Sequence, residues 1–225
     1  MTAPNNDNLA ILIDADNAQA SPIHELLEEV SRYGTASVKR AYGDWSTPQL
    51  KKWKEELHTH AIKPVQQFSY TKGKNATDSA LIIDAMDLLH TGDLNGFCLV
   101  SSDSDFTPLA TRIRESGLVV YGFGERKTPQ PFVAACDKFI YTDILKPPKT
   151  KGTDRRPKFP SPKKKLLEAI DKAAGDDGWA NLGTVGSMLV KNDPSFDSRN
   201  YGFRKLIELV KEQPYLEVRK EKSGS

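Results

Sequence analysis

Two uninterrupted apolar segments, each followed at once by aspartates, constrain the fold of this 225-residue chain more than any other feature. Residues 9–13 (LAILI) precede Asp14, and residues 96–100 (GFCLV) precede three serines and two aspartates within 101–105. A short, wholly apolar run is typical of a strand in the middle of a parallel sheet that helices cover on both faces. Because parallel strands present their carboxyl ends at one edge, we expect the two acidic clusters to lie close together.

The rest of the first 145 residues alternates between strand-like and helix-like patterns. Further strands are expected at 35–42, 62–65, 118–121 and 138–141, and helices at 21–30, 47–60, 78–90, 132–135 and from 106 onward. Such alternation predicts an α/β domain with a mostly parallel sheet and helices on both faces. Thr77 is expected to cap helix 78–90, which places Asp78 in its first turn.

Four aspartates are therefore candidates for one site at the carboxyl edge of the sheet: Asp14, Asp78, Asp103 and Asp105. Crowded carboxylates repel one another unless a cation neutralises them or one takes up a proton. Since no cysteine or histidine accompanies them, the expected ion is Mg²⁺ or Mn²⁺, which polarises phosphates and activates water for in-line attack. The alternative is that Asp103 or Asp105 caps a helix and that Asp78 interacts with a helix dipole.

Neighbouring residues add weaker signals. Lys72 and Lys74 lie in a polar loop and could hold a substrate phosphate, although two solvated lysines are a slightly simpler interpretation. Asp16 is expected to support a helix cap or a hydrogen bond behind the site, because the strand ends at Asp14. The Asp14/Asp16 pair also approaches the aspartyl phosphatase pattern, but the threonine or valine expected two positions later is an alanine here.

Charge is segregated along the chain, which the net value of +2 conceals. Lys/Arg and Asp/Glu number 14 and 19 in residues 1–145 (net −5), 9 and 1 in residues 146–165 (net +8), and 9 and 10 in residues 166–225 (net −1). Residues 146–161 also contain several prolines and no periodicity, which predicts an extended linker. Arg155 and Arg156 are candidates there for contacts with a polyanion, the alternative being a solubilising tether.

Residues 162–220 show three short helical patterns and a strand-like segment at 215–219, which predicts a small winged-helix α+β domain. Cys98 and Cys136 have no metal-binding or disulfide spacing and are expected to be buried thiols in a reducing compartment. No secretory signal and no apolar run of about 18–20 residues is present, so a cytoplasmic protein without a membrane segment is expected.

The motifs LIDADN at 12–17, KNATD at 74–78 and VSSDSDF at 100–106 resemble, in this order, those of the NYN domain. This domain is a PIN-like branch of the flap-nuclease class of metal-dependent ribonucleases. The resemblance covers residues 8–145 and implies a PIN-like, Rossmannoid fold. It also implies that the four aspartates are metal ligands and that Asn17 and Ser101 or Ser102 are polar groups that line the pocket.

The tail at 162–220 resembles the OST-HTH, or LOTUS, domain through GWANLG at 178–183, DPSF at 193–196 and NYGF at 200–203. This resemblance implies binding of RNA, G-rich or structured, or of a partner protein. Together the two resemblances imply a Mg²⁺- or Mn²⁺-dependent endoribonuclease whose tail domain selects the substrate. The alternative is a non-catalytic RNA-binding or regulatory adaptor with the same carboxylates, and the sequence carries no signal for the oligomeric state.

Overall fold

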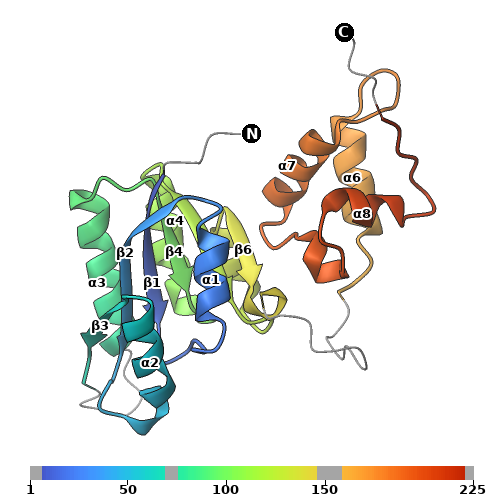
Figure 1. Cartoon of the computed structure of the whole chain (residues 1–225). Helices are drawn as coiled ribbons and strands as arrows, with labels where there is room; N and C mark the ends of the chain where they lie inside the picture. The colour runs from blue at the N-terminus through green and yellow to red at the C-terminus, as the bar shows by residue number, and fades with distance from the viewer. Residues whose placement is uncertain (1–6, 69–75, 146–158, 221–225) are drawn as a thin grey trace, which may run out of the picture. The chain divides into compact units, whose positions relative to one another are not determined.

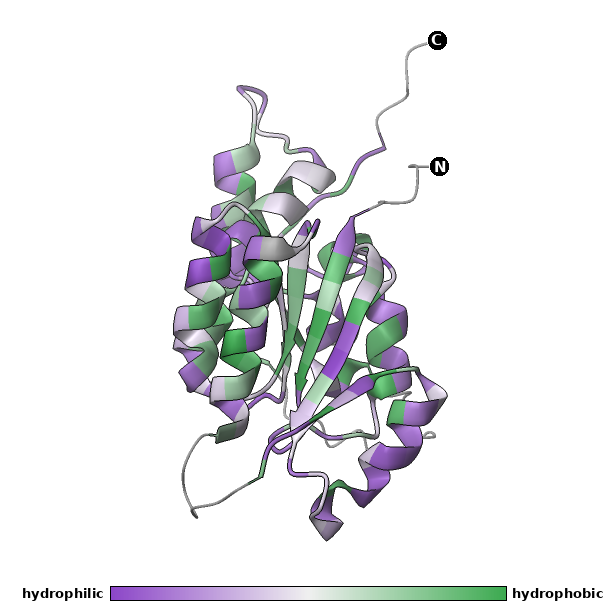
Figure 2. Cartoon of the chain, turned by 90° about the vertical axis from the view of Figure 1, so that its left-hand side faces the viewer, coloured by the Kyte–Doolittle hydropathy of each residue, from purple (hydrophilic) through white to green (hydrophobic). Residues whose placement is uncertain are grey.

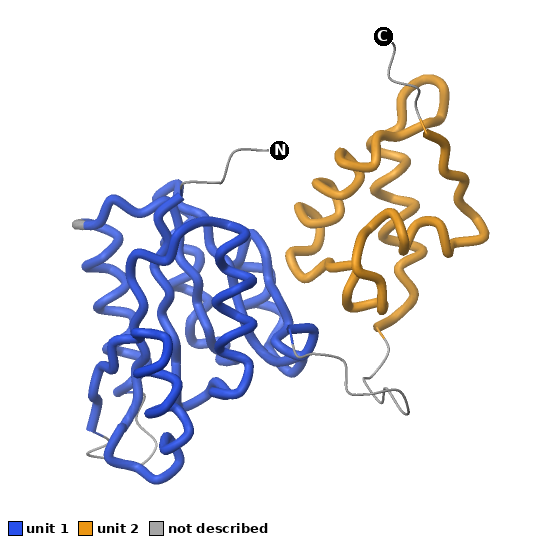
Figure 3. The backbone as a smooth tube through the Cα atoms, viewed as in Figure 1, with its two compact units in different colours: residues 1–147 blue, residues 148–225 orange. Residues whose placement is uncertain are grey.

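The computed structural model describes residues 7–68, 76–145 and 159–220. The chain folds into two compact units, residues 1–147 and residues 148–225 (Figure 3).

A single six-stranded sheet, parallel throughout, forms the centre of the first unit (Figure 1). Its strands are β1 Asn8–Asp14, β2 Thr35–Gly43, β3 Lys63–Gln66, β4 Gly96–Val100, β5 Val119–Gly124 and β6 Lys138–Tyr141, in the spatial order β3-β2-β1-β4-β5-β6. The strand order reverses between β1 and β4, and ligands of open α/β sheets bind at such a switch point. Ile13 pairs with Val100, so Asp14 and Ser101 leave the sheet on neighbouring strands.

Helices cover both faces of the sheet (Figures 1 and 2), which confirms the expected α/β class. They are α1 Ile23–Val30, α2 Lys51–Thr59, α3 Ala76–Thr91, α4 Thr107–Glu115 and α5 Gln130–Ala135, with one-turn 3₁₀ helices at Pro48–Leu50, Ser104–Phe106 and Thr142–Ile144. Alternate residues of β1 (Leu9, Ile11 and Ile13) pack in one core cluster with side chains of α1 and α2, while α3 and α4 cover the opposite face. Figure 2 shows hydrophobic strands between helices whose outer faces are hydrophilic.

A buried polar contact anchors α3 to the sheet. Arg40 and Tyr42 project from β2, and both donate hydrogen bonds to the carboxylate of Asp84 on α3. Tyr42 is fully buried, and burial together with this carboxylate raises the pKa of its hydroxyl. Such partners stabilise a partly buried carboxylate, so the contact helps to place α3 on β2.

The second unit contains α6 Lys163–Ala173, α7 Leu182–Asn192, a 3₁₀ turn at Ser198–Tyr201 and α8 Leu206–Lys211. It has a core of its own, made by Leu166, Ala169, Val185, Leu189, Phe196, Leu209 and Val210. The Asn181 side chain caps α7 by accepting hydrogen bonds from the backbone N–H groups of Gly183 and Thr184, as its sequence position predicts.

The strand expected at residues 215–219 is wrong, because this segment carries no regular structure. Individual side-chain contacts, both cation–π contacts and an ion pair, hold this segment instead. Arg219 lies 4.0 Å from the ring centroid of Trp179 and pairs with Asp177 at 3.1 Å, while the ammonium of Lys163 lies over the ring of Tyr215. These contacts replace the ladder of backbone hydrogen bonds that a strand requires.

Candidate metal centre

Three aspartates from two neighbouring segments converge at the carboxyl edge of the sheet. Asp78 lies in the first turn of α3, and Asp103 and Asp105 follow β4; each offers a carboxylate oxygen within 4.8 Å of the other two. Opposite oxygens around an octahedral Mg²⁺ lie about 4.2 Å apart, twice the ~2.1 Å bond length. Only one pair among three ligands can be opposite, and adjacent oxygens lie about 3.0 Å apart, so side-chain rotations would be needed to bring all three to one ion. An all-oxygen donor set of this kind fits Mg²⁺ or Mn²⁺.

The charges of this cluster act most strongly on Asp78, which is only 8% exposed. Burial, followed by the negative charges of Asp14, Asp103 and Asp105, raises the pKa of Asp78 to about 6. Its ionised form is thus disfavoured in the folded protein, and a bound cation would offset both causes. This electrostatic strain is the second observation, besides the donor set, that fits a divalent ion.

Asp14 lies outside this set of three, although the sequence places it among the ligands. It is fully buried, and its carboxylate accepts hydrogen bonds from the Ser101 hydroxyl (2.7 Å) and from the side-chain and backbone N–H groups of Asn17 (3.0 and 3.3 Å). Burial raises the pKa of Asp14, and these hydrogen bonds oppose that effect. After burial itself, the charge of Asp14 contributes most to the raised pKa of Asp78, so the two carboxylates are electrostatically coupled.

The loop after β4 is ordered by a relay of hydrogen bonds. The backbone N–H of Asp103 donates to the Ser101 hydroxyl (3.1 Å), which in turn donates to Asp14. Asp103 then accepts a hydrogen bond from the backbone N–H of Asp105 (2.9 Å) and so caps the 3₁₀ turn at 104–106. The capping role considered from the sequence is therefore real, but it occupies one of two carboxylate oxygens and is compatible with metal binding.

Thr77 lies inside α3 rather than at its cap, because the helix begins one residue earlier at Ala76. Its hydroxyl donates to the carboxylate of Asp16 at 2.8 Å. This bond joins the first turn of α3, which carries Asp78, to the loop that leaves β1. The expectation that Asp16 supports the site through a hydrogen bond agrees with this contact.

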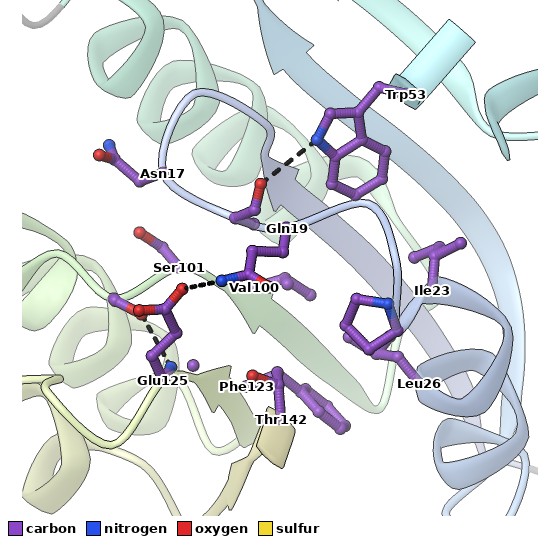
Figure 4. Close-up of a pocket in the computed structure, with 14 residues that line it drawn as sticks. Asn17, Gln19, Ile23, Leu26, Trp53, Val100, Ser101, Phe123, Glu125 and Thr142 are labelled. Atoms are coloured by element: carbon purple, nitrogen blue, oxygen red, sulfur yellow. Dashed lines mark hydrogen bonds between the residues drawn. The ribbon is translucent and has the colours of Figure 1, made fainter. Parts of the chain in front are cut away.

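A shallow pocket adjoins the site where the loops after β1, β4 and β5 meet (Figure 4). Ser102 lines it, and its hydroxyl accepts the backbone N–H of Glu125 (2.8 Å), whose carboxylate accepts the side-chain amide of Gln19 (2.8 Å). At Gly124, a Cβ atom would come within 2.5 Å of the Ser101 carbonyl oxygen, so only glycine permits this approach. Ser102 thus holds the β4 loop against β5 rather than pointing its hydroxyl to the aspartates.

Of the polar residues expected at a substrate, Asn17 and Ser101 contact Asp14; Asn17 is exposed, whereas Ser101 is buried. Lys74, Arg155 and Arg156 lie outside the described residues.

Three residues that hold α3 on the sheet behind the site were not among those expected from the sequence. Arg40 and Tyr42, two residues apart on β2, share one face of the strand and meet Asp84. Asp84 interrupts the apolar side of helix 78–90 between Leu81 and Ala85, and an acidic residue in that position signals a buried partner. That signal was present in the sequence, but the sequence does not show that the partners of Asp84 lie on β2.

Together, the parallel sheet with strand order 3-2-1-4-5-6 and the acidic cluster at its switch point define an α/β protein with a candidate divalent-metal site. The chain belongs to the NYN domain family, whose family model matches residues 8–145, and the OST-HTH/LOTUS domain model matches residues 157–225. Both resemblances inferred from the sequence are thereby confirmed. NYN domains form a PIN-like nuclease family, and OST-HTH domains bind RNA.

A solved structure supports the fold alone. The crystal structure of a protein of unknown function from Vibrio parahaemolyticus is similar, with a TM-score of 0.51 and 20% identity over 62% of this chain and 94% of that one. No curated protein matches the chain. Among the described residues, no helix combines the length and the apolar character needed to cross a membrane.

Proposed function

We propose that the NYN domain is a Mg²⁺- or Mn²⁺-dependent endoribonuclease and that the OST-HTH domain selects the RNA. The observation that carries this proposal is the convergence of Asp78, Asp103 and Asp105 within 4.8 Å at the switch point of the sheet. We propose that the nuclease domain comprises residues 8–145, that the linker comprises residues 146–161 and that the OST-HTH domain comprises residues 162–220.

In this proposal the three converging aspartates hold the ion, and Asp14 is the fourth carboxylate of the site. When bound, the ion would stabilise charge on the phosphate and lower the pKa of a water molecule. The chain's own contribution is orientation: the Ser101 hydroxyl couples Asp14 to the backbone of Asp103, and the Thr77–Asp16 bond holds the turn of Asp78. Asn17, exposed beside Asp14, can offer its amide to a phosphate oxygen.

The basic linker is the proposed source of long-range attraction to RNA. The nuclease domain carries a net charge of −5 over residues 1–145, so its overall charge disfavours the approach of a polyanion. Lys74, Arg155 and Arg156 are proposed phosphate contacts for this reason. A partner protein bound through the OST-HTH domain is a further proposal that the family resemblance supports.

The test is cleavage of end-labelled RNA by the purified full chain with Mn²⁺ or Mg²⁺, compared with EDTA. Wild-type protein should cleave only with metal, leaving 3′-hydroxyl and 5′-phosphate ends, because water rather than the RNA 2′-hydroxyl attacks. Asp103→Asn should abolish cleavage, whereas Asp93→Asn, which removes an equal charge from an exposed position before β4, should not.

Equal residual activity in wild-type and Asp103→Asn protein would identify a contaminating nuclease. RNA binding without any metal-dependent cleavage would instead favour the non-catalytic adaptor.

A further inference from the structure

A groove of about 660 Å³ lies between α2 and the edge strand β3, outside the acidic site. It is lined by Trp45, Lys54, Leu57, His58, Ala61, Ile62 and Pro64. Its volume falls within the ~300–1,000 Å³ typical of pockets that bind small organic groups. The lining is apolar and partly aromatic, with a lysine and a histidine as its polar members.

The ring of Trp45 is held in this groove by hydrogen bonds from Trp45 to β3. Its indole N–H donates to the carbonyl of Val65 (3.0 Å), and its backbone N–H donates to the side chain of Gln66 (3.1 Å). Gln66 is held in turn by Asp44 at 2.9 Å. Because the polar atom of the indole is already paired, the ring offers an immobile apolar surface, which costs little conformational entropy on binding.

The groove and the acidic site are connected along the carboxyl ends of three adjacent strands. Trp45 lies two residues after Gly43, the end of β2, which pairs with Gln66 at the end of β3. A Cβ atom on Gly43 would lie 3.2 Å from the Asp16 carboxylate, and Asp16 bonds to Thr77, the neighbour of Asp78. An extended ligand that starts at the aspartates and runs along the carboxyl edge of the sheet would therefore pass the end of β2 and then the end of β3, where Trp45 lies.

Charge around the groove favours a polyanion. Four lysines on α2 and β3 are exposed, Lys51, Lys52, Lys54 and Lys63, and Lys54 among them lines the groove. They are four of the 14 cationic residues in a region whose net charge is −5. Two glutamates share α2; Glu55 is exposed, and Glu56 lies 3.3 Å from His60. Aromatic surfaces flanked by cations are the usual means by which proteins hold single-stranded nucleic acid.

We propose that this groove is a base-binding subsite, in which one base of the RNA strand stacks on Trp45 beside His58 while Lys54 faces an adjacent phosphate. The proposal rests on the proposed function, since it takes RNA as the ligand that crosses the acidic edge. A peptide added to the edge of the sheet fits less well, because Pro64 removes a backbone N–H from the middle of β3.

The test measures binding of fluorescent single-stranded RNA to the full chain in EDTA, where no cleavage occurs. Trp45→Ala should weaken binding about 5- to 100-fold, as expected for one lost stacking contact, while Trp45→Phe keeps most of the affinity. Lys54→Ala should weaken binding less and reduce its salt dependence. Thermal melts of each variant check that the fold is retained.

A second measurement begins with wild-type protein, whose result does not depend on the folding of any variant, and then compares the variants. RNAs with a single abasic nucleotide, moved stepwise along the strand, should bind more weakly when one position lacks its base. Trp45→Phe should be sensitive to that same position, and Trp45→Ala or His58→Ala should be less so.

Three outcomes are informative. Unchanged RNA affinity in Trp45→Ala, or an abasic scan with no sensitive position, overturns the subsite even when cleavage is normal. Capture of a peptide in place of RNA overturns it as well. Position-specific loss of binding without any metal-dependent cleavage supports the subsite and rejects only the nuclease.

Discussion

Replacing Asp78 with asparagine should stabilise the metal-free protein. The pKa of Asp78 rises from 3.8 to about 6 in the fold, so the folded state binds a proton more readily than the unfolded state. Stability then falls as pH rises through this range and is lowest above pH ~6, where Asp78 is forced to ionise. This difference in the pKa of Asp78 corresponds to about 3 kcal/mol, which is an upper bound for the stability gained by removing the charge.

The assay is urea denaturation in EDTA, followed by fluorescence, to which Trp45 and Trp53 of the first unit contribute. At about pH 7.5, Asp78→Asn should be more stable than wild type by up to about 3 kcal/mol, and the difference should shrink towards pH ~4. Asp93→Asn, an exposed control of equal charge, should have little effect. Added Mn²⁺ should stabilise wild type by about 2.7 kcal/mol at 100 times its Kd but leave Asp78→Asn nearly unchanged.

A metal-free Asp78→Asn protein that is less stable than wild type at neutral pH would refute this reasoning. It would show that the carboxylate is favourable where it lies, as a partner of the α3 dipole, and that the neighbouring aspartates do not strain it.

Three further predictions follow from other contacts. Tyr42→Phe should cost about 1–2 kcal/mol of stability, because Asp84 loses a buried donor, and should also weaken Mn²⁺ binding in calorimetry; the matched Tyr33→Phe, which loses a bond to Glu29 on α1, should leave metal binding intact. Ala61 has a backbone φ of 50°, a left-handed conformation that is strained for alanine, so Ala61→Gly should raise stability by about 0.5–1 kcal/mol in urea melts. A loss of stability would show that the backbone at Ala61 is not strained. Changing Arg155 and Arg156 to glutamine should flatten the slope of log K against log salt by about 1.4, whereas an unchanged slope would identify the linker as a tether.

Much of the site was predictable because its position follows from simple rules. Aspartates directly after apolar strands must lie at the carboxyl edge of a parallel sheet, and this places Asp14, Asp103 and Asp105 on one side of the domain. The first turn of a helix that follows a strand also starts at that edge, which places Asp78. These rules depend only on the order of strands and helices along the chain, and that order can be predicted from the sequence.

Side-chain orientation was not predictable, because it depends on segments distant in sequence. Ser102 turns to the backbone of Glu125, and Asp14 is enclosed by its own neighbours, so that three carboxylates converge rather than four. A strand was expected at 215–219, but this segment has no regular structure and Arg219 stacks on Trp179. The groove at Trp45 is built from three separate segments and has no single motif.

The most direct measurement is a crystal of the full chain soaked in Mn²⁺ and recorded at the manganese absorption edge. The account predicts an anomalous peak about 2.1–2.2 Å from oxygens of Asp78, Asp103 and Asp105, at the switch point between β1 and β4, and no such peak in Asp103→Asn crystals. Protein that cleaves RNA with Mn²⁺ but shows no peak among these aspartates, or a peak elsewhere in the domain, would contradict it.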